Sequence, residues 1–267
     1  MLLSVVIPAR NEAACIVSTI PGIAGTLRGQ HIPHEIIVVD DGSSDGTAEA
    51  VRGLARSYPE IRLIINPGPH GFGYAVRAGL RSFQGDAVAI MMADNSDSPQ
   101  DLVSYYECLE LGAECVFGSR FIKGGTTIDY PIHKLILNRL ANRFISVLFG
   151  LSLNDTTNAF KCYRRNVIEG LQPLISPHFN LTVEMPLKAI ARGYGYVVVP
   201  ISWRNRAVGV SKLKLKEMGS RYLFVVLNIW LEKYLTQGDY HRRSQVSRGA
   251  QAQQTDVEAP VELLRNV

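Results

Sequence analysis

The first 120 residues alternate short apolar runs with segments of helical periodicity, and this alternation restricts the folds open to the chain more than any other feature. The apolar runs cover residues 2–8, 35–40, 61–66, 86–93 and 113–119. The helical patterns between them cover residues 12–28, 45–57, 72–83 and 99–110. Short apolar runs separated by helices are typical of a mostly parallel sheet with helices on both faces. We therefore predict an α/β domain whose ligand binds beyond the carboxyl ends of the strands.

The second half of the chain is less regular. We predict helices at residues 131–149 and 180–192, strands at 158–164 and 196–203, and an amphipathic helix at about 213–236. No run of ~18 apolar residues exists, so no segment is expected to span a bilayer. After Arg242 the chain is polar, and we predict that residues 241–267 form a largely disordered tail. Residues 1–240 then form one domain.

Composition and cysteine content narrow the functional classes. The net charge of +4 is too small to indicate nucleic-acid binding. The four cysteines show no CxxC spacing, which argues against a zinc site and a disulfide framework and favours a reducing cytoplasm. The first residues, MLLSVVIPARNE, lack the charged leader and long apolar core of a signal peptide. We therefore expect a cytoplasmic protein.

Three predicted strands end in acidic residues, in "IPARNE", "VVDDGSSDGT" and "MMADNSD". Gly42 and Gly46 suit a tight turn, and Ser44 or Asp45 can cap the following helix. This turn chemistry does not require the doubled aspartate before it, so we interpret Asp41 as a ligand-binding residue. The chain has no Walker A motif and no GxGxxG fingerprint.

These segments carry a resemblance to a known family. "VVIPARNE", "IIVVDDGSSDGT", "GFGYAVRAGL", "GSRFIKGG", "DTTNAFKCYRR" and "GVSKL" occur in order between about residues 3 and 216. The chain resembles the family-2 glycosyltransferases, and within them the dolichyl-phosphate mannosyltransferase and polyprenyl-phosphate glycosyltransferase group. The resemblance implies one glycosyltransferase A-type, Rossmann-like domain. It also implies inverting transfer from a nucleotide sugar, commonly with Mg²⁺ or Mn²⁺.

The resemblance also assigns residues to the donor nucleotide. Those expected around the base and ribose are Pro8, Ala9, Glu12 and Asp41. Those expected to flank the nucleotide are Gly71, Tyr74 and Arg77. Asp41 would accept a hydrogen bond from the base ring N–H, which both uracil and guanine carry, so the donor is a GDP-sugar or a UDP-sugar.

The metal site departs from the family pattern, which is usually Asp-Ala-Asp. Here the sequence reads Met92-Ala93-Asp94, and Asp97 follows three residues later. Mg²⁺ and Mn²⁺ take oxygen ligands and share them with substrate phosphates, so Asp94, with Asp97 in place of the missing aspartate, is the predicted ligand pair. In the alternative interpretation Asp97 only favours a helix that starts with Ser98 and Pro99.

The basic residues of the second half point to phosphate binding. The resemblance places Arg120, Arg206, Ser211 and Lys212 near the donor diphosphate and the acceptor phosphate. Such cations can stabilise a leaving nucleoside diphosphate, although a solvated basic loop is the simpler explanation of such a cluster. Asp155 and Glu184 match positions of the polyprenyl-phosphate group. Glu184 is expected to orient the acceptor or to pair with a basic residue.

We therefore expect an inverting enzyme that moves a hexose to a polyprenyl or dolichyl phosphate, an acceptor that is anionic at pH 7 and needs no general base. One alternative is transfer to a sugar hydroxyl. Another is a non-catalytic nucleotide-sugar-binding module, suggested by Met92. Basic residues precede the apolar part of the helix at about 213–236, and this suits peripheral contact with the cytoplasmic face of a membrane, although that helix could equally pack on the domain. They are Lys212, Lys214, Lys216 and Arg221.

Overall fold

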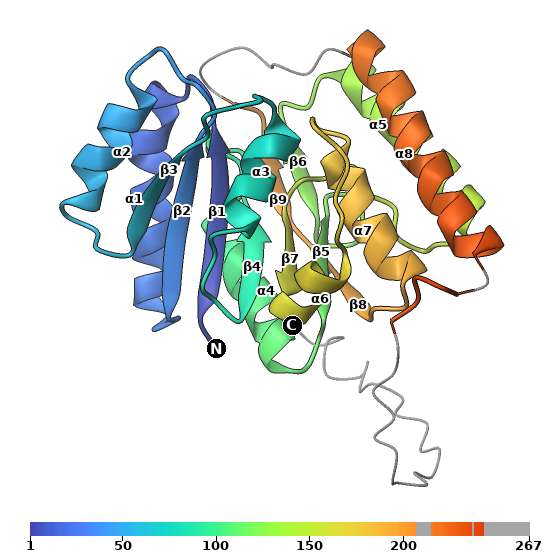
Figure 1. Cartoon of the computed structure of the whole chain (residues 1–267). Helices are drawn as coiled ribbons and strands as arrows, with labels where there is room; N and C mark the ends of the chain where they lie inside the picture. Colours follow the sequence, from blue (N-terminus) through green and yellow to red (C-terminus); the bar gives the residue numbers. More distant parts are fainter. Residues whose placement is uncertain (207–214, 237, 243–267) are drawn as a thin grey trace, which may run out of the picture.

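The computed structural model describes residues 1–206, 215–236 and 238–242, and its centre is a seven-stranded sheet (Figure 1). The strand order is β3-β2-β1-β4-β7-β5-β8. Their bounds are Leu3–Ala9 (β1), His34–Asp40 (β2), Ile61–Ile65 (β3), Ala87–Ile90 (β4), Cys115–Ser119 (β5), Lys161–Arg164 (β7) and Tyr196–Pro200 (β8). All neighbours pair in parallel except β7, which runs antiparallel to β4 and β5. The predicted mostly parallel α/β domain is confirmed.

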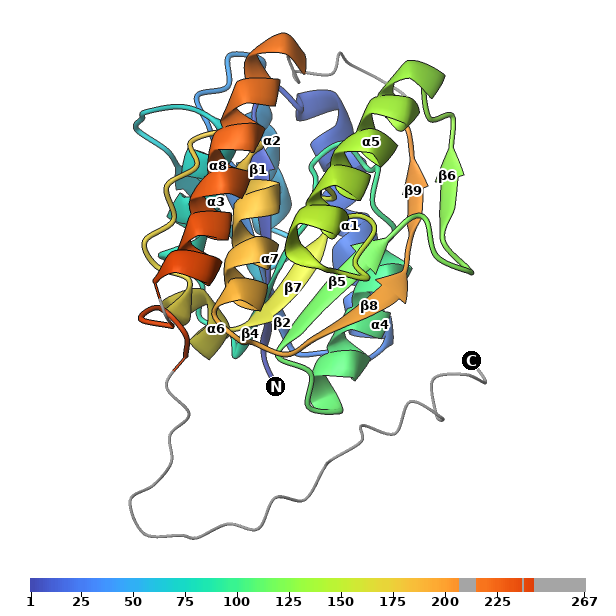
Figure 2. The same ribbon diagram turned by 90° about the vertical axis from the view of Figure 1, so that its right-hand side faces the viewer.

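Helices cover both faces of this sheet. α1 (Ala13–Gly29), α2 (Thr47–Ala55) and α4 (Pro99–Glu110) pack on one face. α3 (Phe72–Leu80), α6 (Arg165–Gly170) and α7 (Leu181–Ala191) pack on the other. α5 (Ile132–Phe149) and α8 (Leu215–Leu235) lie outside α7 and form a further layer (Figure 2). Apolar residues of α5, α7 and α8 share one core cluster, so this outer layer is part of the same domain.

The apolar run predicted as one strand over residues 196–203 forms two strands. β8 stays in the central sheet, and β9 (Ser202–Arg204) leaves it to pair with β6 (Thr126–Ile128). Trp203 of β9 also bridges to Asp97 through the backbone. The sequence pattern did not reveal this change of partner, because a continuous apolar run carries no signal of where one pairing ends.

The order of the strands places the ligand site. From β1 the chain continues to β2 and β3 on one side, whereas β4 lies on the other side of β1. In such sheets the connections diverge at this point and leave a crevice at the carboxyl ends of the two strands. The segments that follow β1 and β4 are residues 10–12 and 91–98. Among the described residues no helix is long and apolar enough to cross a membrane.

Candidate active site

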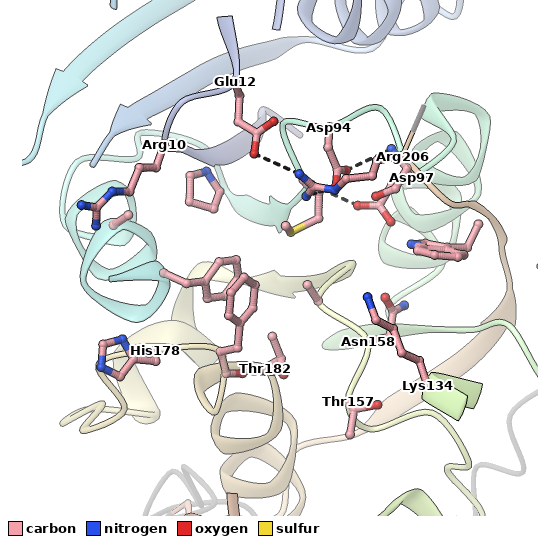
Figure 3. A pocket seen from close by; sticks show the side chains of 18 of the residues that line it. Arg10, Glu12, Asp94, Asp97, Lys134, Thr157, Asn158, His178, Thr182 and Arg206 are labelled. Carbon is pink, nitrogen blue, oxygen red and sulfur yellow. Dashed lines mark hydrogen bonds and ion pairs between the residues drawn. The ribbon is translucent and has the colours of Figure 1, made fainter. Parts of the chain in front are cut away.

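A cleft of about 680 Å³ opens at the crevice between β1 and β4 (Figure 3). The predicted site residues that line it are Pro8, Ala9, Glu12, Asp41, Gly71, Asp94, Asp97, Arg120 and Arg206. The predicted site residues outside its lining are Tyr74, Arg77, Asp155 and Glu184. Ser211 and Lys212 lie outside the described residues, as does the predicted tail from residue 243 onwards.

Asp41 lies at the end of the cleft that is formed by the segments after β1 and β2. The carboxylate is buried and accepts hydrogen bonds from the Asn66 side-chain amide and the Gly71 backbone N–H, both at 2.7 Å. His70 lies 3.3 Å away, and Arg10 is at 4.0 Å. These donors keep the carboxylate oriented at the cleft wall. A carboxylate offers about four acceptor positions, so it retains capacity for the ring N–H of a base.

Gly71 lies where two segments approach closely. A Cβ atom at this position would come within 2.5 Å of the Pro177 carbonyl oxygen, so only glycine fits. Arg77 and Tyr74, one turn further along α3, do not reach the cleft. The Arg77 guanidinium donates to the Leu174 carbonyl at 2.5 Å and lies over the Tyr74 ring at 4.7 Å. Arg77 thus holds the 174–178 segment, and the contact of Tyr74 and Arg77 with the nucleotide stays a prediction.

Glu184 has the same structural role. It is fully buried and accepts hydrogen bonds from the backbone N–H groups of Ile175 (2.8 Å) and Ser176 (2.7 Å). Lys188, one turn later, pairs with it at 2.8 Å. All of these contacts lie outside the cleft, so of the two predicted roles of Glu184 the structure shows the pairing with a basic residue. Its carboxylate holds the segment that packs against Gly71.

The segment after β4 returns both predicted metal ligands to the cleft. Asn95 adopts the left-handed conformation, with φ of 60°, and turns the chain. The Asp97 carboxylate points back and accepts the Met92 backbone N–H at 3.0 Å. Ser98 caps α4 by accepting from the Gln100 backbone N–H at 3.3 Å. Ser98 therefore caps the helix as predicted, and the Asp97 carboxylate lines the cleft, where the predicted metal site lies.

The carboxylates of Asp94 and Asp97 are suited to a divalent cation that binds together with the phosphates of a donor nucleotide. Burial raises the pKa of Asp97 to about 7, with a smaller contribution from the charge of Asp94 and against the hydrogen bond from the Met92 backbone N–H. A cation between the two acids would relieve this repulsion. The described residues contain no group of three or more acidic, histidine or cysteine side chains suited to a metal ion. Donor phosphates and water would supply the remaining oxygen ligands, as Mg²⁺ commonly requires.

Arg206 already places a cation at this point (Figure 3). One guanidinium nitrogen lies 2.5 Å from the Asp94 carboxylate, and the other lies 3.5 Å from Glu12. The arginine therefore joins the segment after β1 to the segment after β4. A guanidinium at this position is also placed to bind the oxygens of a diphosphate.

Arg120 is fixed by a buried partner. The fully buried Asp155 accepts from the Arg120 backbone N–H at 3.0 Å and from two guanidinium nitrogens at 2.8 and 2.7 Å. The rings of Tyr130 and Trp203 lie 5.5 and 5.8 Å from the guanidinium carbon. The Asp155 carboxylate is thus bound to Arg120 outside the lining of the cleft, and its predicted contact with the substrate stays a prediction. The Asp155 carboxylate orients the Arg120 guanidinium in the cleft wall.

Several cleft residues were missed in the sequence. They are Arg10, His70, Lys134, Asn138, Trp203 and Arg221. Lys134 and Asn138 share one face of α5, but the helix also carries other polar residues, among them Arg139 and Arg143, so the spacing did not single them out. Arg221 comes from α8, which reaches the cleft only through tertiary packing. Figure 3 shows Lys134 across the cleft from Glu12.

Comparison with known proteins agrees with this geometry. Residues 4–171 match the family described as Glycosyl transferase family 2. The chain is 33% identical over 217 residues to the polyprenol monophosphomannose synthase of Mycolicibacterium smegmatis, covering 78% of this chain and 80% of that protein. It is 31% identical over 220 residues to the dolichol-phosphate mannosyltransferase of Pyrococcus furiosus, covering 81% of this chain but only 60% of that longer protein.

Solved structures show the same fold. Glucosyl-3-phosphoglycerate synthase from Mycobacterium tuberculosis, in complex with Mn²⁺, UDP-glucose and phosphoglyceric acid, superposes with a TM-score of 0.66 at 19% identity. The superposition covers 86% of this chain and 79% of that one. The architecture is thus the GT-A fold of glycosyltransferases. Together with the match over residues 4–171, this means that the chain belongs to glycosyl transferase family 2 and is a glycosyltransferase.

Proposed function

We propose that the enzyme transfers mannose from a nucleoside diphosphate sugar, GDP-mannose in the first instance, to a polyprenyl phosphate. The names of the relatives from Mycolicibacterium smegmatis and Pyrococcus furiosus support the sugar and the acceptor. The observation that carries the proposal is the division of charge in the cleft. Its described carboxylates follow β1, β2 and β4, whereas the described side chains of α5 and α8 that line the cleft include Lys134 and Arg221 and no carboxylate. A wall of this kind suits an anionic acceptor.

In the proposed reaction the nucleotide lies at the β1 and β2 ends, with its base against Asp41. Arg206 binds the diphosphate, and Arg120 and Lys134 bind the acceptor phosphate. An acceptor phosphate oxygen attacks the anomeric carbon, the bond to the diphosphate breaks, and the configuration inverts. The phosphate is already ionised, so no residue has to remove a proton. Arg206 offsets the charge that develops on the leaving diphosphate.

We propose that Asp94 and Asp97 hold Mg²⁺ or Mn²⁺ together with the donor. The ion would offset charge on the diphosphate. Support comes from the two adjacent carboxylates and from the Mn²⁺ in the nucleotide complex of the related fold. The Ser211 and Lys212 side chains stay a prediction for the phosphates, since both lie outside the described residues.

We also propose that the enzyme works at the cytoplasmic face of a membrane and binds no nucleic acid. A polyprenyl phosphate is held in a bilayer, so the enzyme must reach that surface. All four cysteines are free thiols, as expected in a reducing compartment. The mild net charge of +4 supports the proposal that the enzyme binds no nucleic acid.

An acceptor panel tests the proposed function. The enzyme is incubated with GDP-mannose or UDP-glucose and with a short-chain polyprenyl phosphate, the matching polyprenol, or a mannose-ended glycan, and products are identified by mass spectrometry. We expect product with the phosphate and not with the alcohol. Transfer to the glycan alone would establish the hydroxyl-acceptor alternative. Nucleotide-sugar binding without transfer or hydrolysis would establish the non-catalytic module.

A further inference from the structure

A lysine is fully buried behind one wall of the cleft. Lys161, on β7, is 1% exposed, and its ammonium donates hydrogen bonds to the backbone carbonyls of Thr156, at 2.9 Å, and Asn158. It also donates to the carbonyl of Thr182, in the first turn of α7, at 3.4 Å. Asn158 and Thr182 line the cleft, so the ammonium lies directly behind the cleft surface. We call residues 155–158 the wall loop.

The position of this cation carries a desolvation penalty. Burial lowers the pKa of Lys161 to about 7, although the Asp155 carboxylate acts in the opposite direction. An apolar side chain of similar length would fill the same space and avoid that penalty, but it could not donate to three carbonyl oxygens. The structural contribution of Lys161 therefore lies in these hydrogen bonds, which fix the wall loop against α7.

The wall loop in turn holds Arg120. Asp155, its first residue, is fully buried and accepts from two nitrogens of the Arg120 guanidinium at 2.8 and 2.7 Å. Thr156 follows directly in the chain, and its carbonyl is one of those that Lys161 binds. A displacement of this carbonyl would therefore move the carboxylate and the guanidinium that is bound to it.

The wall loop also holds the half of α5 that carries Lys134. The Thr157 hydroxyl accepts from the side-chain amides of Asn138 at 2.7 Å and Asn142 at 3.0 Å. Among the described residues of α5, none before Asn142 is buried, so core packing contributes little to the position of this half. Lys134 lies one turn before Asn138, and its position depends on these contacts. Figure 3 shows Lys134 and Thr157 on the same side of the cleft.

We propose that Lys161 is a positioning residue for acceptor binding: it holds the wall loop from behind and so keeps Arg120 and Lys134 in place for one phosphate group. The roles of these two cations rest on the proposed function, but their positioning does not require transfer. The Asp41 end of the cleft is held by other contacts, from the Asn66 side chain and the Gly71 backbone. Binding of the donor should therefore depend much less on Lys161.

Steady-state kinetics of Lys161→Met test the proposal, with a short, water-soluble prenyl phosphate as acceptor. Methionine fills the space but donates no hydrogen bond. We expect the KM for the acceptor to rise about tenfold or more, and the KM for GDP-mannose to stay within about twofold of the wild type.

Arg164→Met is the matched control. Arg164 lies on the same strand and also donates to backbone carbonyls, those of Ala113, at 2.8 Å, and Leu109. It pairs with Ala87 at the start of β4, whereas Lys161 pairs with Ile90 at its cleft end. The control therefore loses the same kind of bond far from the cleft, and both KM values should stay close to those of the wild type.

Hydrogen exchange read by mass spectrometry tests the positioning without any transfer. In Lys161→Met the amides of residues 132–142 and of the wall loop should exchange about tenfold faster than in the wild type, and in Arg164→Met they should not. Asn142→Leu breaks the link from the wall loop to α5 and leaves the described lining of the cleft intact. It should raise the acceptor KM about threefold, and it serves the test if Lys161→Met does not fold.

The outcomes are distinguishable. An unchanged acceptor KM in folded Lys161→Met would overturn the proposal. So would an equal rise of both KM values, because Lys161 would then support the whole domain and not the acceptor wall. Unchanged acceptor KM and exchange in Asn142→Leu would also overturn it, since Lys134 would not depend on the wall loop. If the wild type transfers no sugar to a lipid phosphate, the proposed function fails, and the exchange rates alone decide the positioning.

Discussion

The pair between Arg206 and Asp94 predicts that removing an arginine makes the enzyme bind a divalent ion more tightly. In the free protein the guanidinium lies 2.5 Å from Asp94 and 3.5 Å from Glu12, so it takes the place of a cation beside the predicted ligands. A metal ion must displace it or share the carboxylates with it. Arg206→Ala removes this competition.

The size of the effect follows from the contacts. A hydrogen bond to a charged group contributes about 1.5–3 kcal/mol, and the partial exposure of Arg206 places this pair at the low end. About 1.4 kcal/mol corresponds to a tenfold change in affinity. We therefore expect Arg206→Ala to bind Mn²⁺ about tenfold more tightly than the wild type when no nucleotide is present.

The assay is Mn²⁺ titration followed by electron paramagnetic resonance or calorimetry, repeated with GDP. The same variant should bind GDP more weakly, because the diphosphate loses a cation, so the two changes have opposite signs. Arg10→Ala is the matched control, since Arg10 lines the cleft 4.0 Å from Asp41 and does not contact Asp94 in any described interaction. Unchanged Mn²⁺ affinity in Arg206→Ala would refute the reasoning. So would a higher Mn²⁺ affinity that persists when Asp94→Asn is added to Arg206→Ala.

Three further predictions concern buried carboxylates. Asp155→Asn leaves Arg120 without its buried counter-charge and should lower the free energy of unfolding in urea by about 3–5 kcal/mol. Glu184→Gln should likewise destabilise the protein, by about 1–3 kcal/mol, and adding Lys188→Met should restore part of the loss. The pKa of Asp97 is about 7 in the folded protein and lies near 3.8 when unfolded, so its favourable contribution is full below pH 4 and lost as the pH rises through 7. Asp97→Asn should therefore stabilise the metal-free protein by about 2–4 kcal/mol at pH 8, and by less at pH 5.

Each of these has a result that contradicts it. Urea curves of Asp155→Asn that superpose on the wild type would mean that Arg120 does not depend on its partner. If the double variant Glu184→Gln/Lys188→Met is less stable than Glu184→Gln alone, an unpaired Lys188 is not the cause of the lost stability. For Asp97→Asn, measured in EDTA, an equal change in stability at pH 5 and pH 8 would show that this carboxyl does not titrate between those two pH values.

The part of the cleft that follows β1, β2 and β4 could be predicted from the sequence, for a physical reason. In a parallel sheet the residues that end neighbouring strands meet at one edge, so Glu12, Asp41 and Asp94 were brought together by strand order alone. The start of α4 was also predictable, because Ser98 and Pro99 form a local capping signal.

The part of the cleft formed by α5, β9 and α8 was much less predictable. Lys134, Trp203 and Arg221 come from a helix, a short edge strand and a late helix whose mutual placement depends on packing, and no local pattern encodes that. For Glu184 the resemblance left two roles open, and only the folded chain shows the pairing with Lys188 one turn away. The antiparallel insertion of β7 between β4 and β5 was also hidden, since a strand pattern carries no direction.

Analysis of the reaction product tests the central claim most directly. The wild-type enzyme is given GDP-mannose labelled at the anomeric carbon and a short-chain polyprenyl phosphate, and the purified product is examined by carbon and phosphorus nuclear magnetic resonance. We predict a sugar joined through its anomeric carbon to the lipid phosphate, with the configuration opposite to that of the donor. A product joined to a sugar hydroxyl, or one that retains the donor configuration, would contradict direct displacement by a lipid phosphate.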